Sequence, residues 1–108
     1  MRDGLYKVQF DTQRGTGSGV VFLQGGKLRG GDSRTYYVGT YAENGRQFTA
    51  RVTTDQHTDV PGMSSVFGVD RAHITLLGTS TVDSAEMTGT AAEAPGISFR
   101  ARLMRIAD

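Results

Sequence analysis

The sequence predicts an all-β fold: an antiparallel up-and-down β-barrel of about eight strands in one domain, residues 1–108. Threonine, valine, tyrosine and phenylalanine recur in short runs, which is typical of strands. Apolar and polar residues alternate with a period of two in the clearest runs. Glycines stand inside several runs, at positions 17, 19, 39 and 89, and such glycines mark the bends that a barrel needs to close. A two-layer sandwich with bulges is the alternative fold.

Short runs of alternating residues follow one another along the chain. In the first run, Tyr6, Val8 and Phe10 share one face, and polar residues share the other. Gly25 and Gly26 predict a two-residue hairpin turn between the second and third runs. The expected strands are 5–11, 16–24, 27–30, 34–42, 46–54, 72–79, 85–92 and 97–106.

Two connections between these runs carry a specific expectation. The stretch Glu43-Asn44-Gly45 predicts a turn, because asparagine and glycine both tolerate a positive φ. The segment PGMSSVFG, residues 61–68, leaves room for at most one short helical turn near residues 61–67. No convincing amphipathic helix is predicted elsewhere.

Composition excludes several classes of function. The formal net charge is +1, which gives no bulk attraction to nucleic acid or to an anionic membrane. Cysteine is absent, so the chain has neither disulfides nor thiolate metal ligands, and this fits a reducing compartment. No apolar run resembles a signal core or approaches the ~18 residues of a membrane helix. We therefore expect a cytoplasmic protein that contacts neither nucleic acid nor membrane directly.

Glycine-rich stretches raise the question of a phosphate site. A phosphate site at Gly30, Gly31 and Asp32 would require a helix directly after these residues, because the free amides at a helix N-terminus bind the anion. The residues that follow, TYYVGTY, are β-branched and aromatic and predict a strand instead. We interpret Gly30 and Gly31 as a structural bend, with Asp32 capping a turn through its side chain.

The sequence offers few other candidates for a metal site or a catalytic site. Asp55, His57 and Asp59 would share one face of an extended strand, but the surrounding TTDQHTDVPG is typical of a solvated loop. Ser18 stands between two glycines and lacks the strand-to-helix elbow of a nucleophilic serine. We therefore predict no catalytic residue, no metal and no cofactor, and hence no enzyme.

The aromatic and aliphatic residues of one strand face are the candidates for the barrel interior. In a barrel of this size they either fill the interior or leave space for one small apolar ligand, and both outcomes stay open. A slip of one residue in register would exchange the inner and outer faces. The cavity candidates are Tyr6, Val8, Phe10, Tyr37, Phe99 and Leu103.

Three stretches resemble a known family. DGLYKVQF at 3–10, GTGSGVVFLQGGKLRGGD at 15–32 and YYVGTY at 36–41 are similar to the GrlR-like family of type III secretion negative regulators, and this chain is closer to that family's small uncharacterised bacterial members. The most specific element is the Gly-Gly-Asp stretch at 30–32. The resemblance implies a calycin-like eight-stranded barrel that is usually dimeric and has no catalytic activity. It also implies binding to a transcriptional activator, and an apolar ligand inside the barrel.

In that family an exposed acidic run, Glu-Asp-Glu-Asp, follows the Tyr-x-Gly strand and carries the regulatory activity. The corresponding residues here are Ala42-Glu43-Asn44-Gly45, in which only Glu43 matches. The resemblance makes Glu43 and Asn44 the candidate partner-binding loop. The leading hypothesis is a non-enzymatic regulator that acts through protein–protein binding, as a homodimer with a two-fold contact. The alternative is a lipocalin-like barrel that binds a small apolar ligand.

Overall fold

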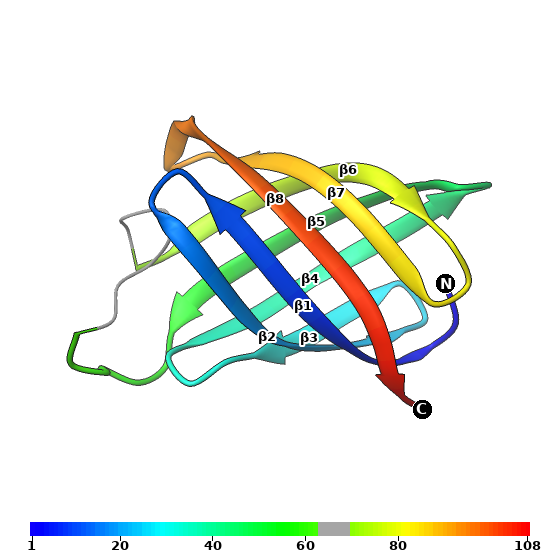
Figure 1. Cartoon of the computed structure of the whole chain (residues 1–108), viewed down its shortest axis with the longest axis horizontal. Coiled ribbons are helices and arrows are strands. Elements are labelled where there is room, and N and C mark those ends of the chain that lie inside the picture. Colours follow the sequence, from blue (N-terminus) through cyan, green and yellow to red (C-terminus); the bar gives the residue numbers. More distant parts are fainter. Residues whose placement is uncertain (63–69) are drawn as a thin grey trace.

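A computed structural model describes residues 1–62 and 70–108, which form a closed antiparallel barrel (Figure 1). Each strand pairs with the next one along the chain, and the last strand pairs with the first. This closure confirms the predicted up-and-down barrel and excludes the sandwich. The strands are β1 Gly4–Thr12, β2 Gly15–Gln24, β3 Lys27–Gly31, β4 Thr35–Asn44, β5 Gln47–Gln56, β6 Ala72–Ser80, β7 Ser84–Ala91 and β8 Ala94–Ala107.

The hydrophobic core is the interior of the barrel. Alternate residues of a strand point to opposite faces, so each strand sends one set of side chains inward. All eight strands contribute buried apolar residues, and the largest fully buried side chains are Tyr6, Phe48, Leu23 and Leu103. Removal of this apolar surface from water is the main favourable contribution to the stability of the barrel.

The connections follow the turn chemistry of glycine. Gly25 and Gly26 have φ values of 58° and 83°, and they join β2 to β3 while Gln24 pairs with Lys27. Two successive positive φ angles are the signature of the tight hairpin turn whose twist matches that of the flanking strands. The predicted Gly-Gly hairpin is therefore confirmed.

The turn predicted at Glu43-Asn44-Gly45 is shifted. Glu43 and Asn44 are the last two residues of β4 and pair with Phe48 and Gln47 of β5, so they are strand residues and form no loop. The turn consists of Gly45, with φ 62°, and Arg46. Gly45 alone supplies the left-handed conformation, so Asn44 keeps an extended backbone and the ladder runs one residue further than expected.

Glycines inside strands mark places where neighbouring backbones approach closely. Gly30 and Gly31 belong to β3, and the connection to β4 begins at Asp32. A Cβ atom on Gly30 would lie 2.0 Å from the carbonyl oxygen of Val20 on β2. A Cβ atom on Gly78 would lie 1.8 Å from the carbonyl oxygen of Glu86 on β7. No other residue fits these two positions without movement of the backbone, and the barrel can coil tightly there.

Several strands extend beyond the predicted bounds, and β5 and β8 are two of them. β5 continues to Gln56, so Asp55 belongs to the sheet and not to the expected loop. β8 begins at Ala94, three positions before the predicted start at 97. The helical turn expected near 61–67 falls almost entirely outside the described residues. Within the described part of the chain, no helix has the length and apolar character needed to cross a membrane.

The barrel has two distinct ends, which we call the terminal end and the loop end (Figure 1). The terminal end carries both chain termini and the connections β2–β3, β4–β5 and β6–β7. The loop end carries the connections β1–β2, β3–β4, β5–β6 and β7–β8. Residues on opposite ends of one strand therefore belong to different environments.

Candidate functional site: the barrel interior

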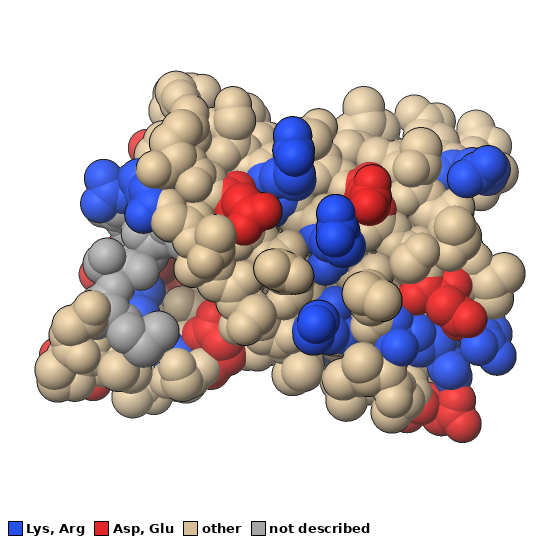
Figure 2. All heavy atoms as spheres, viewed as in Figure 1, with Lys and Arg blue, Asp and Glu red and all other residues tan. Residues whose placement is uncertain are grey.

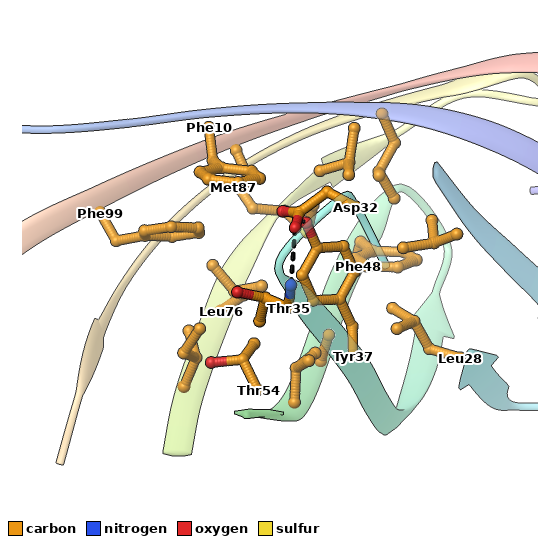
Figure 3. A pocket seen from close by; sticks show the side chains of 17 residues that line it. Phe10, Leu28, Asp32, Thr35, Tyr37, Phe48, Thr54, Leu76, Met87 and Phe99 are labelled. Atoms are coloured by element: carbon orange, nitrogen blue, oxygen red, sulfur yellow. Dashed lines mark hydrogen bonds between the residues drawn. The ribbon is translucent and has the colours of Figure 1, made fainter. Parts of the chain in front are cut away.

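The interior is not completely filled. A cavity of about 90 Å³ lies between the strands, and Figure 3 shows the side chains of 17 described residues that line it. Most of these side chains are aliphatic or aromatic. Oxygen-bearing side chains reach the cavity at Asp32, Thr35, Tyr37 and Thr54, all of which lie toward the loop end. The cavity is therefore apolar along most of its length and polar at one end.

Five of the six predicted cavity residues line this space: Val8, Phe10, Tyr37, Phe99 and Leu103. The sixth, Tyr6, is fully buried nearer the terminal end and is not part of the lining. Its hydroxyl donates a hydrogen bond of 2.5 Å to the carbonyl oxygen of Arg2, and burial raises its pKa above the ordinary tyrosine value.

Sequence reasoning missed the part of the lining that β2, β3, β5, β6 and β7 supply. Phe48, Leu28 and Met87 are prominent members of it. The signal for Phe48 was present, because alternation placed it with Ala50 and Val52 on one face of its strand. Alternation alone does not say which face of a given strand points inward.

Aromatic rings gather at the loop end of the cavity. Phe10 stacks on Phe99 with ring centroids 5.8 Å apart, and it meets Tyr37 edge-on at 6.3 Å. Glycines on β2 make room for these rings. A Cβ atom on Gly17 would lie 2.4 Å from the Phe10 ring, and one on Gly19 would lie 2.7 Å from the Tyr37 hydroxyl. These glycines let two large side chains lie flat across the inner wall.

The polar end of the cavity is organised by one carboxylate, that of Asp32. Its Oδ1 accepts hydrogen bonds from the backbone amides of Arg34, at 2.9 Å, and Thr35, at 2.8 Å, which is the predicted capping of the turn. Its Oδ2 accepts a hydrogen bond from the Tyr37 hydroxyl, and Figure 3 shows these groups together. Burial, followed by the hydrogen bond to Asp32, raises the pKa of Tyr37. Tyr37 is therefore a neutral donor at physiological pH.

Arg34 is two residues from Asp32 in sequence, but its guanidinium pairs with a different carboxylate, that of Asp70. It is buried, with 7% of its surface exposed. Its guanidinium forms an ion pair of 2.5 Å with Asp70 and contacts the side-chain oxygen of Gln56 at 3.4 Å. Arg34 thus ties the β5–β6 connection to the barrel, and its charge is balanced by Asp70.

The candidate partner-binding residues occupy the terminal end. Both carboxylate oxygens of Glu43 lie 2.7 Å from the amino-terminal nitrogen of Met1, and the Ser80 hydroxyl donates to Oε2 at 2.8 Å. Burial alone would raise the pKa of Glu43, but the hydrogen bonds from the amino terminus and from Ser80 lower it below the ordinary value. Asn44 is exposed beside it. The charge of Glu43 is therefore neutralised within the same chain.

The residues considered for metal or nucleophilic chemistry do not converge. Asp55 accepts a hydrogen bond from the Gln56 amide, while His57 contacts the hydroxyl of Thr58 and the backbone oxygen of Asp32. Among the described residues, no group of three or more histidine, cysteine or acidic side chains is placed to hold a metal ion. Ser18 is exposed on the outer face of β2.

The outer wall carries mixed charge and a small apolar area. In Figure 2 basic and acidic side chains are interspersed over the visible face, so they form no large field of one sign there. Val20 and Phe22 of β2 and Tyr36 of β4 are apolar side chains of the outer wall that are exposed by 41%, 38% and 41%. Val20 and Tyr36 lie on either side of Gly31, which has no side chain.

The fold and the site define a class: a small closed β-barrel with a largely apolar cavity and, among the described residues, one carboxylate at one end of it. No family model matches the chain, and no curated protein matches it either. The similarity to the GrlR-like family over residues 3–41 therefore stays a prediction.

Proposed function

We propose that this protein is a non-enzymatic binding module whose barrel interior takes a compact apolar ligand. The observation that supports the proposal is the apolar cavity of about 90 Å³. An engineered apolar cavity of about 150 Å³ binds benzene, whereas sites for drug-sized ligands measure about 300–1,000 Å³. The ligand is therefore a small molecule, or the compact end of a larger one.

Filling the cavity with a ligand would lower the free energy of the folded protein. Unfilled apolar volume costs about 24 cal/mol per Å³, so a void of about 90 Å³ destabilises the barrel by about 2 kcal/mol. A ligand that fills the void restores the missing dispersion contacts and stabilises the folded state.

Two matched pairs of residues test the proposal. Met87 and Leu103 line the cavity, whereas Met104 and Leu77 are exposed on the outer wall by 50% and 52%. We expect titration with benzene or isoamyl alcohol to shift the methyl NMR signals of the inner pair and to leave those of the outer pair in place. Absence of any shift at Met87 and Leu103, at ligand concentrations that reach the solubility limit, would reject the proposal.

The regulatory role expected from the family resemblance is a second proposal. The exposed apolar residues Val20, Phe22 and Tyr36 support it, because contiguous apolar surface marks contacts between proteins. We propose a second copy of the chain as the occupant, since two-fold pairing is the commonest way to cover such a surface. The transcriptional activator has less support, because Glu43 already balances the amino terminus and offers little charge to a basic partner.

Light scattering coupled to size-exclusion chromatography tests the dimer. We expect a dimer for the native chain, and a monomer for Phe22→Ser. Leu77→Ser is the control, because it removes an exposed apolar side chain from a different part of the wall. A monomeric native chain contradicts this second proposal and leaves the ligand-binding proposal intact.

A cytoplasmic location stays a prediction from the cysteine-free composition.

A further inference from the structure

We propose that the cavity selects a compact apolar amine, whose ammonium group binds the carboxylate of Asp32. This inference rests on the proposed ligand-binding function and names the chemical class of the ligand. It starts from the polar end of the cavity, where the half-buried carboxylate of Asp32 lies with the hydroxyl-bearing side chains of Thr35, Tyr37 and Thr54.

Among the described residues, the side chain of Asp32 contacts no cationic group. Its three side-chain hydrogen bonds come from two backbone amides and the neutral Tyr37 hydroxyl. Among the described residues, none of the ion pairs involves Asp32, and the nearby Arg34 pairs with Asp70. A carboxylate has about four acceptor positions, so one remains for a ligand donor. A buried charge favours a partner of opposite sign.

The carboxylate is also held in a fixed orientation. The two amides that bind Oδ1 belong to the turn that Asp32 itself caps, so the hairpin orients the side chain. The Tyr37 ring that binds Oδ2 packs edge-on against Phe10, and its hydroxyl lies over Gly19. A preorganised acceptor loses little conformational freedom when it binds a donor.

The position of the carboxylate sets the orientation of the ligand. Asp32, Thr35 and Thr54 lie toward the loop end, whereas Phe48 and Leu103 line the deeper part of the cavity. An amine would therefore place its hydrocarbon part among the deep apolar side chains and its ammonium group at the loop end. The volume of about 90 Å³ limits the hydrocarbon part to a few carbon atoms. A fatty acid would bring its own carboxylate next to Asp32, and like charges repel.

Three probes with nearly the same hydrocarbon skeleton test the inference in the native protein: isoamylamine, isoamyl alcohol and isovalerate at neutral pH. The readout is the methyl NMR signal of Met87, which lines the cavity. We expect the amine to bind about tenfold more tightly than the alcohol, which is the usual advantage of a charge-assisted hydrogen bond. We expect isovalerate to leave the Met87 signal in place.

Asp32→Asn provides the matched variant, because asparagine retains an oxygen that can cap the turn and loses the charge. We expect the amine to bind this variant no more tightly than the alcohol does. Asp59→Asn is the control, since it removes the same charge from an exposed residue of the β5–β6 connection that does not line the cavity. The control variant should keep the full preference for the amine.

The outcomes separate the inference from the function on which it rests. If all three probes shift Met87 with similar affinity, or isovalerate binds best, the cavity binds ligands but amine selectivity is wrong. If none shifts Met87, both the function and the inference are wrong. These results come from the native chain, so they stand even where Asp32→Asn does not fold. An unchanged preference in a folded Asp32→Asn variant also overturns the inference.

Discussion

The terminal end and the loop end of this barrel are built from the same eight strands, but the interior is packed differently at the two ends. At the terminal end Tyr6 and Phe48 are fully buried, and the amino terminus is fastened to Glu43. At the loop end Phe10 and Thr35 are half-buried and the cavity meets a lone carboxylate. The comparison teaches that the chain's own residues fill the interior at one end, while free volume and a carboxylate remain at the other.

The largest expected effect comes from replacing one phenylalanine at each end. Phe48→Ala should lower the free energy of unfolding by about 3–5 kcal/mol, because the ring is fully buried and leaves a large void. Phe10→Ala should cost only about 1–2 kcal/mol, because its ring is partly exposed. Urea unfolding measures both values. Equal losses would show that the two ends are equally well packed.

A pair of glycines gives the next largest effect. Gly78→Ala should lower the free energy of unfolding by about 2–4 kcal/mol, since the new Cβ atom meets the backbone carbonyl of Glu86 at 1.8 Å. Gly17→Ala should cost about 1 kcal/mol or less, because the Phe10 ring that it meets can rotate away. Thermal unfolding of the two variants is the measurement. A larger loss for Gly17→Ala would mean that the loop end is the more rigid one.

The ion pair that fastens the amino terminus gives a smaller, pH-dependent effect. Glu43→Gln should cost about 1 kcal/mol at neutral pH, because the carboxylate is partly shielded from solvent and accepts from two groups. The pKa of Glu43 is lowered in the folded protein, so its contribution is complete above the ordinary value of 4.5. That contribution disappears as the pH falls through the lowered pKa. Native and variant stabilities, measured by urea unfolding over this pH range, should therefore converge in acid.

The smallest expected effect concerns an exposed pair at the loop end. The hydrogen bond from the His73 side chain, with a second from its backbone, lowers the pKa of Glu93 to about 2. His73→Ala should raise this pKa part of the way toward 4.5, because the backbone amide of residue 73 still donates to Glu93 at 2.7 Å. Carbon-13 NMR of the Glu93 carboxyl group follows the titration. A midpoint that stays near 2 in the variant would exclude the His73 side chain as the cause.

Any stability that Glu93 contributes should be complete above pH 4.5, the ordinary pKa, and should vanish as the pH falls toward 2. The native chain and His73→Ala should therefore differ little in stability at neutral pH, because both groups are exposed to solvent.

Strand alternation and glycine chemistry predicted most of the fold. The apolar face of Tyr6, Val8 and Phe10 points inward, and Gly25-Gly26 forms the expected hairpin. Errors occurred where local signals conflict. Pro95 and Gly96 are typical of a loop, yet both lie within β8, at the irregularity in its pairing with β7.

The candidate site was less predictable, because its contacts depend on which strand residues face one another and not on local sequence alone. The turn-capping role of Asp32 follows from local chemistry, but its bond to Tyr37 depends on the hairpin register that pairs Gly30 with Tyr37. The attachment of Glu43 to the amino terminus joins residues 42 positions apart, so no local sequence pattern indicates it. Such contacts become visible only once the barrel is closed.

Closure through the pairing of β8 with β1 has a consequence for biosynthesis. The register joins Leu5 to Ala107 and Asp11 to Arg100, so the seam is made by the contacts most distant in sequence. Loop closure over such a distance is slow. Until β8 pairs with β1, the sheet has two free edges, one of which is β1, and their backbone hydrogen-bonding groups have no partner strand. On the ribosome, β8 must leave the exit tunnel before the seam can form. The nascent barrel therefore completes its folding only after β8 has emerged, and the interval before that is when it is most exposed to aggregation and to chaperones.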